Sequence, residues 1–183
     1  RFAVIGKPCD IAGLRNLARY DRRVDELVPI TVVFLCAGVS SLRISEQLAS
    51  KHGVAAADVT RLRYRGHGCP GPTRLETSDG RAFEQSYDDT WSNELAQDIQ
   101  FRCKICPDST GEQADITCGD AWQNEDGYSH GEQEGWTATI ARTRAGTKLL
   151  SDMQQSGAII TEPLALDRIK RAQSHHTERK QSA

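Results

Sequence analysis

A long apolar run near the start of the chain constrains the fold more than any other feature. The run from Val28 to Leu35 is rich in valine and isoleucine and ends at Cys36, Ala37 and Gly38. A strand with one face in water alternates apolar and polar residues, whereas this run is apolar at nearly every position. It therefore predicts a central strand, buried on both faces and parallel to its neighbours.

The segments around this run extend the pattern. A short apolar run from Phe2 to Gly6 predicts an earlier strand. Apolar residues at helical spacing follow each predicted strand, namely Ile11, Leu14, Leu17 and Ala18 after the first and Ile44, Leu48 and Ala49 after the second. Because strands joined through a helix run parallel in one sheet, the opening of the chain predicts a parallel α/β layer.

The pattern then changes to hairpin chemistry. Ser78, Asp79 and Gly80 separate two candidate strands at 73–77 and 81–86, and an Asp-Gly pair suits the positive φ angles of a tight hairpin turn. Further predictions are helices at 91–99 and 147–155, strands at 114–117, 136–141 and 159–162, and a polar loop at 123–134. The expected fold class is α/β, a mostly parallel sheet with flanking helices and a β-hairpin insertion, with cluster-binding loops at one sheet edge.

Length and charge limit the number of domains and the classes of partner. A chain of 183 residues suggests one principal domain, residues 1–173, before a disordered tail at 174–183. The formal net charge is -2 with both signs interspersed, so no nucleic-acid partner is expected. No apolar run reaches the roughly 20 residues of a membrane helix, and we expect a cytoplasmic protein without a membrane span. The start at Arg1, without Met, suggests that an N-terminal part is missing.

The chain contains six cysteines, and their positions favour metal or redox chemistry. Secreted disulfide scaffolds are usually smaller and dominated by loops. Cys9 and Cys36 each follow a predicted strand, so their thiols should open onto the same edge of a parallel sheet. Cys9 also lies near a helix N-terminus, which favours thiolate. From the spacing alone, however, a cysteine after a buried strand is more often a small core residue.

A second cysteine feature is Cys103-Lys104-Ile105-Cys106-Pro107. A two-residue gap allows both sulfurs to reach one metal centre, and proline after the second cysteine is typical of ferredoxin-type loops. The two single cysteines and this pair make four thiols. Arg102 and Lys104 would offset the negative charge that four thiolates bring to a cluster. Taken alone, the pair suits a zinc ribbon, a redox dithiol or an iron–sulfur cluster about equally.

Other residues suggest contacts to a cofactor. Arg65 and the glycine-rich loop with Gly66, His67 and Gly68 suit a phosphate, although a solvated turn is the simpler interpretation. Three further residues could line a flavin site. The alternative interpretation is that the aspartates lie in turns and the tryptophan lies in the core. These residues are Asp115, Asp120 and Trp122.

Six segments occur in an order that resembles a known family. They are Gly6 to Asp10, Phe34 to Gly38, Tyr64 to Gly68, Arg102 to Asp108, Ala114 to Ile116, and Gly119 to Trp122. In this order they resemble the C-terminal domain of the coenzyme F420 hydrogenase/dehydrogenase beta-subunit family, within its bacterial branch related to FAD and iron–sulfur chlorophyll-type reductases. The resemblance runs from residue 2 to about residue 174. Cys69 departs from the family pattern, in which a larger or polar residue is common.

The resemblance implies cofactors and their ligands. It implies a 4Fe-4S cluster bound by Cys9, Cys36, Cys103 and Cys106, with Cys69 and Cys118 excluded. It also implies FAD, with contacts from Arg65, Gly66, His67, Gly68, Asp115, Asp120 and Trp122. No side chain is then required as a catalytic acid or nucleophile, because the cofactors supply the chemistry.

The function that the resemblance implies is an FAD- and iron–sulfur-dependent oxidoreductase. It would pass electrons between the cluster, the flavin and a hydride-accepting or hydride-donating partner such as coenzyme F420. The implied partners are ferredoxin or another redox subunit, and an oligomer is left open. Three alternatives also remain open: a ferredoxin-dependent tetrapyrrole (chlorophyll-type) reductase of the same family, a zinc-ribbon-bearing interaction module, and a metal-free dithiol or disulfide protein.

Overall fold

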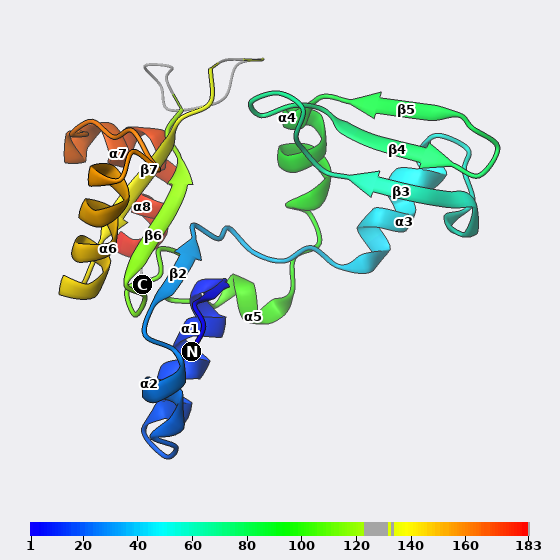
Figure 1. Cartoon of the computed structure of the whole chain (residues 1–183). Coiled ribbons are helices and arrows are strands. Elements are labelled where there is room, and N and C mark those ends of the chain that lie inside the picture. Colours follow the sequence, from blue (N-terminus) through cyan, green and yellow to red (C-terminus); the bar gives the residue numbers. More distant parts are fainter. Residues whose placement is uncertain (123–131, 133, 183) are drawn as a thin grey trace. The chain divides into compact units, whose positions relative to one another are not determined.

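The chain divides into two compact units in the computed structural model, which describes residues 1–122, 132 and 134–182 (Figure 1). The first unit comprises residues 1–37, 107–121 and 136–183, and the second comprises 38–106 and 122–135. The sequence patterns predict one principal domain over residues 1–173. Two units form because the chain leaves the first sheet after its second strand and builds a separate hydrophobic core before returning, and local patterns do not mark these points.

The first unit contains a sheet with the strand order β1-β2-β6-β7. Its strands are β1 (Val4–Gly6), β2 (Thr31–Phe34), β6 (Ile116–Asp120) and β7 (Thr137–Ala141). β2 pairs parallel with β1 on one side and with β6 on the other, whereas β7 is antiparallel. The predicted central parallel strand and the mostly parallel sheet are therefore confirmed. The strand is shorter than the apolar run, however, and it is not buried on both faces, because Val32 is half-buried and Phe34 is 47% exposed.

A small hydrophobic cluster fixes the first helix on this sheet. Ile11, Val33 and Ala114 are almost fully buried, and Val4 and Leu14 pack against them. The backbone at Gly111 approaches this cluster so closely that a Cβ there would lie 2.0 Å from Val33 Cγ2, and its φ is +72°. Only glycine meets both conditions, so the loop before β6 packs directly against Val33 of β2.

Within its described residues, the first unit contains five helices. They are α1 (Pro8–Ala18), α2 (Arg23–Leu27), α6 (Arg144–Gln155), α7 (Leu166–Ala172) and α8 (Ser174–Gln181). Thr143 is the N-cap of α6, and its hydroxyl accepts a hydrogen bond from Gly146 N at 3.1 Å. The helix predicted at 147–155 is therefore present, and it begins earlier, at Arg144, after this N-cap.

Two predictions for the C-terminal part are wrong. Residues 159–162 do not form a strand. Ile160 is 97% exposed, so burial of its apolar side chain does not stabilise an extended conformation there. The tail predicted to be disordered forms α8 from Ser174 to Gln181. The composition of this segment is polar, and the helix is held by contacts to distant loops that local sequence does not reveal.

The second unit is built on an antiparallel sheet with the order β3-β4-β5. Its elements are α3 (Leu42–Lys51), the 3-10 turn η1 (Ala56–Asp58), β3 (Val59–Arg63), β4 (Thr73–Thr77), β5 (Ala82–Gln85), α4 (Tyr87–Thr90), the π-helix η2 (Trp91–Leu95) and α5 (Phe101–Lys104). The predicted hairpin is confirmed as β4 and β5, with Gly80 at φ +85°. The patterns did not identify β3, which pairs with β4 and makes the hairpin part of a sheet.

The core of the second unit lies between α3 and its sheet. Ala49, Val54 and Leu75 are buried together, and Leu62 and Phe83 pack against them. The helix predicted at 91–99 is a single π-helical turn that ends at Leu95. Most of the loop predicted at 123–134 lies outside the described residues. In the part of the chain that the structure describes, no helix is long and apolar enough to cross a membrane.

Candidate functional site

Two of the predicted cysteines lie at the carboxyl edge of the parallel strands. β1 ends at Gly6 and β2 at Phe34, and because the two strands are parallel their following loops leave from the same edge. Cys9 lies in the first turn of α1 and is exposed. Cys36 is half-buried, and its N–H donates to the carbonyl of Ser109 at 3.0 Å.

The pKa of Lys7 supports the placement of Cys9 and Cys36 at the same edge of the sheet. The pKa of its ammonium is raised, first by a hydrogen bond to Asp10, against an opposing effect of burial. The negative charges that Asp10, Cys9 and Cys36 carry when ionised raise this pKa further. Lys7 therefore lies within electrostatic reach of both thiols.

The loop beside Cys36 is pre-organised by Asp108. Its carboxylate accepts hydrogen bonds from the backbone N–H groups of Thr110, Gly111 and Glu112, at 2.9, 2.7 and 3.0 Å. Ser109 in the same loop is 2% exposed, and its Oγ has no partner among the described residues. A buried hydroxyl without a partner is costly, and it is a donor of the kind that hydrogen-bonds to the sulfur atoms of a bound cluster.

The other two predicted ligands lie in the second unit. Cys103 in α5 is buried, and its N–H donates to Gln100 O at 2.8 Å. The N–H of Cys106 reaches Cys103 O at 3.4 Å, so the pair occupies one turn of chain. A Cβ at Gly38, whose φ is +144°, would lie 3.4 Å from Cys103 Cβ. Glycine thus allows the chain to pass close to the buried cysteine.

The four predicted ligands are therefore divided in pairs between the two units. Within the described residues, no group of three or more His, Cys, Asp or Glu side chains is gathered closely enough to hold a metal ion. The donor chemistry itself fits an iron–sulfur cluster, because thiolates are the usual ligands of such clusters and two cysteines accompany a basic residue at one sheet edge. The ligand set remains a prediction.

The two excluded cysteines differ from these four. Burial raises the pKa of Cys118, opposed by a hydrogen bond with Thr139, so the neutral thiol is favoured. Cys69 lies in the glycine-rich loop, and a Cβ at Gly135 would lie 3.2 Å from its Sγ. A thiol held in its neutral form is a poor ligand, which supports the exclusion of Cys118.

Two predicted cofactor residues, Arg65 and Trp122, meet in the second unit. The Arg65 guanidinium carbon lies 5.5 Å from the centroid of the Trp122 ring and 5.4 Å from that of Tyr87. Tyr87 also stacks on Trp91 at 5.5 Å between centroids. Trp122 is 9% exposed. The result is an aromatic cluster of Tyr87, Trp91 and Trp122 with a cation at its edge, an environment suited to a planar anionic cofactor.

Tyr87 and Trp91 were not identified from the sequence. Their signal is weak, because aromatic residues four positions apart are typical of an ordinary helical face. The π-helix that begins at Trp91 supplies the missing information, since such single turns occur frequently at functional sites. Trp91 is oriented by its Nε1–H, which donates to Tyr64 O at 3.2 Å.

The glycine-rich loop beside Arg65 presents backbone amides. His67 has φ 61°, and at Gly71, with φ +73°, a Cβ would lie 2.4 Å from Gly66 O. The Gly71 N–H donates to Glu132 Oε1 at 2.9 Å. A carboxylate therefore accepts from this loop as a phosphate oxygen would, which supports an anion-binding role for the loop.

Asp115 and Asp120, the remaining predicted cofactor residues, belong to the first unit. Asp115 is 5% exposed, and its carboxylate accepts hydrogen bonds from Thr31 N, Thr31 Oγ1, Arg15 Nη2 and Thr143 Oγ1. Burial pushes its pKa up, but these donors outweigh burial and hold the pKa below its usual value. This network ties α1, β2 and the start of α6 together. Asp120 ends β6, and its carbonyl accepts from Gln173 Nε2 at 2.5 Å.

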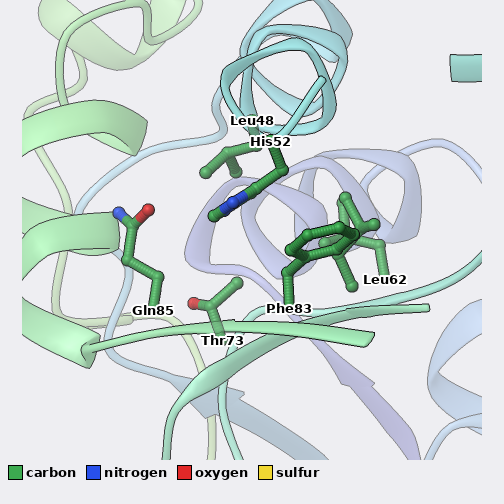
Figure 2. Close-up of a pocket in the computed structure, with 7 residues that line it drawn as sticks. Leu48, His52, Leu62, Thr73, Phe83 and Gln85 are labelled. Atoms are coloured by element: carbon green, nitrogen blue, oxygen red, sulfur yellow. The ribbon is translucent and has the colours of Figure 1, made fainter. Parts of the chain in front are cut away.

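A pocket in the second unit is too small to hold a cofactor. Figure 2 shows His52 over Phe83, with Thr73 and Gln85 nearby. The rings of His52 and Phe83 are stacked, with centroids 4.9 Å apart. The cavity volume is about 10 Å³, which is enough for a single water molecule. The pocket is therefore a packing gap between α3 and the sheet.

Comparisons with known proteins agree with the order of the motifs. A family model for the C terminus of the beta subunit of coenzyme F420 hydrogenase/dehydrogenase matches residues 1–166. The chain is similar to coenzyme F420 hydrogenase subunit beta of Methanococcus voltae, with 23% identity over 169 residues. It is also similar to the protein of the same name from Methanothermobacter thermautotrophicus, with 27% identity over 94 residues.

The matches cover different shares of each protein. The Methanococcus voltae match covers 88% of this chain and 52% of the relative, and the Methanothermobacter match covers 50% and 30%. A solved chain of the F420-reducing NiFe hydrogenase complex from Methanosarcina barkeri, studied with xenon, has a TM-score of 0.63 at 21% identity. That match covers 98% of this chain and 59% of the other. The chain thus spans about half or less of the curated relatives that it matches, and the solved structure supports the fold.

Proposed function

Because this chain belongs to the coenzyme F420 hydrogenase/dehydrogenase beta-subunit family, we propose that it is the part of an oxidoreductase that holds a 4Fe-4S cluster and contributes to a flavin site. The complete protein would exchange electrons with a redox partner, such as ferredoxin or another subunit, and hydride with coenzyme F420. The names of the relatives support the redox class and the choice of F420 as the first substrate to test.

One observation carries the proposal for the cluster. Two adjacent parallel strands deliver Cys9 and Cys36 to the same sheet edge, and Lys7 lies within electrostatic reach of both thiols. Structural cysteines buried in a core need neither a shared edge nor a cation. We therefore assign Cys9 and Cys36, with Cys103 and Cys106, as the cluster ligands.

The surrounding residues suit this role. Lys7 places a positive charge within electrostatic reach of both thiols, the loop around Asp108 fixes the backbone that receives the Cys36 N–H, and Ser109 offers a buried donor. Hydrogen bonds to cluster sulfur atoms and nearby positive charge tune the reduction potential. These residues therefore hold the ligands and adjust their electronics without taking part as acids or nucleophiles.

For the flavin, we propose contacts from the second unit. Arg65 and the amides of the 66–71 loop would bind phosphate, and Trp122 would form an aromatic wall. A flavin accepts hydride and releases electrons singly, so it links F420 chemistry to a one-electron cluster. For Asp115 we infer a structural role, since its carboxylate already accepts four hydrogen bonds within the first unit.

Anaerobic purification of the complete protein tests the proposal. We expect about four iron and four sulfide ions per chain and absorption near about 400 nm, together with bound FAD. We also expect reduction of F420 by a reduced electron donor. Zinc without sulfide would instead indicate the interaction module, and activity on tetrapyrroles without F420 activity would indicate the reductase alternative. A protein with neither metal nor flavin would contradict the proposal.

A further inference from the structure

The C-terminal helix α8 makes contacts that its sequence does not predict. The family match ends at residue 166, whereas α8 runs from Ser174 to Gln181. Helices of eight residues are marginal in isolation, and this one is polar on all sides. Its formation therefore depends on what it touches.

The segment from Gln173 to Lys180 contacts three backbone carbonyls in the first unit. Gln173 Nε2 donates to Asp120 O at 2.5 Å, and Arg179 Nη1 donates to Ala37 O at 3.1 Å. Lys180 Nζ pairs with Glu112 Oε2 at 2.9 Å and makes a longer contact of 3.5 Å to Pro107 O. A hydrogen bond to a backbone carbonyl fixes the orientation of that peptide group. These bonds therefore restrain the backbone conformation at each of the three positions.

These carbonyls have a common position in the fold. Ala37 directly follows Cys36 in the loop after β2, and Asp120 is the last residue of β6. Pro107 directly follows Cys106 in the sequence. α8 is thus bonded to the loop after one predicted ligand and to the residue after another. Two of the three contacts are made by cationic side chains.

The helix is anchored by one buried side chain. His176 is 7% exposed, although its neighbours on α8 are mostly in solvent, and Ala172 at the end of α7 is 5% exposed. The anchor fixes the start of α8, so Arg179 and Lys180 are presented one turn later toward the loops. A disordered tail with the same charges would pay a larger entropic cost for each contact.

We propose that α8 is a clasp that fixes the backbone of the loop after Cys36 and of the loop that follows Cys106, with Arg179 and Lys180 as positioning residues. Through the carbonyls of Ala37 and Pro107, they restrain the backbone directly after the ligand positions Cys36 and Cys106. This inference rests on the proposed cluster ligands, and neither basic residue is itself a ligand.

The double variant Arg179→Gln/Lys180→Gln tests the clasp in the complete protein. Lys170→Gln/Arg171→Gln is the matched control, because it removes the same charge from α7, where Lys170 pairs locally with Asp167. We expect the clasp variant to lose iron to a chelator about tenfold faster than the control, as is typical when support around metal ligands is lost. Glu112→Gln, which alters the loop side of the Lys180 pair, should show a smaller effect in the same direction.

Hydrogen exchange of the iron-free protein separates this inference from the proposed function. Faster exchange at residues 36–38 and 108–112 in the clasp variant than in the control supports the clasp, whether or not iron binds. Equal exchange in the two variants would overturn it. Absence of iron from the unaltered protein would instead overturn the ligand assignment. If the double variant unfolds, the same exchange measurement on the Glu112→Gln protein, compared with the control, tests the clasp instead.

Discussion

Arg15 and Asp115 lie 100 positions apart in the sequence and meet in the first unit, with Arg15 Nη2 3.1 Å from Asp115 Oδ2. Arg15 extends from α1, and Asp115 immediately precedes β6. The same carboxylate binds the backbone and the hydroxyl of Thr31 on β2. One buried anion therefore joins three segments that the chain brings together only on folding.

Asp115→Ala should destabilise the first unit by about 3 kcal/mol, because it leaves a partly buried guanidinium and several donors without their acceptor. Asp25→Ala is the matched control. Asp25 also faces Arg15, but at 3.9 Å and with 66% of its side chain exposed, so little change is expected. Urea denaturation followed by circular dichroism measures both. Equal losses in the two variants would contradict the structural role of Asp115.

His176 should make the stability pH-dependent. Burial, followed by the charges of His175 and Arg179, lowers the pKa of His176 to about 4 from 6.5. The unfolded chain then binds more protons than the folded chain between these two values, so stability falls as the pH decreases from about 6.5 to 4. The shift corresponds to a loss of at most about 3 kcal/mol, and above pH 6.5 the contribution is constant.

The variant His176→Leu checks this pH dependence. His176 Nδ1 has no hydrogen-bond partner among the described residues, so an apolar side chain should be tolerated at pH 7. Urea midpoints at pH 7 and pH 4.5 should differ less in the variant than in the unaltered protein. An unchanged difference would assign the acid sensitivity to other groups.

The sequence predicted the sheet because the information is local. The apolar run from Val28 to Leu35 and the Asp79-Gly80 turn each identify an element directly, and both are confirmed. β3 and α8 were missed because their stability comes from partners outside the segment itself. Val59 to Arg63 pairs with β4, and Arg179 bonds to Ala37, 142 positions away.

The candidate site was predicted to a similar extent. Strand ends placed Cys9 and Cys36 at one edge because parallel pairing follows from the strand–helix–strand order. Lys7, Ser109 and Tyr87 were not identified as site residues, since lysine, serine and tyrosine are common in any loop. Only their positions in the folded structure indicate a role. Ser109, for example, has a buried hydroxyl that lacks a partner among the described residues.

Arg65→Gln should weaken flavin binding about tenfold, since loss of a partly desolvated cation beside aromatic rings costs about 1 to 2 kcal/mol. Arg65→Lys should recover only part of the loss, because lysine cannot stack or bind phosphate with a planar fork. Arg61→Gln, at an exposed position on β3, is the control. Fluorescence titration of the flavin-free protein with FAD measures each affinity, and an equal effect of Arg61→Gln would indicate a general charge effect.

Replacement of single cysteines by serine gives the sharpest test of the ligand set. Serine is a poor iron ligand, so Cys9→Ser, Cys36→Ser, Cys103→Ser and Cys106→Ser should each lose most of the bound iron and sulfide. Solubility should also fall, because metal binding is coupled to folding. The measurement is the iron and sulfide content of each anaerobically purified variant.

The matched controls are Cys69→Ser and Cys118→Ser, which should keep the iron content of the unaltered protein. Cys118 is the firmer exclusion, because burial raises the pKa of its thiol and disfavours the thiolate that a cluster needs. Cys69 is a sharper test, since it lies in the glycine-rich loop beside Arg65 and precedes proline, as Cys106 does. Full iron in Cys9→Ser or Cys36→Ser would remove the first unit from the ligand set, and loss of iron in Cys69→Ser would transfer a ligand to that loop.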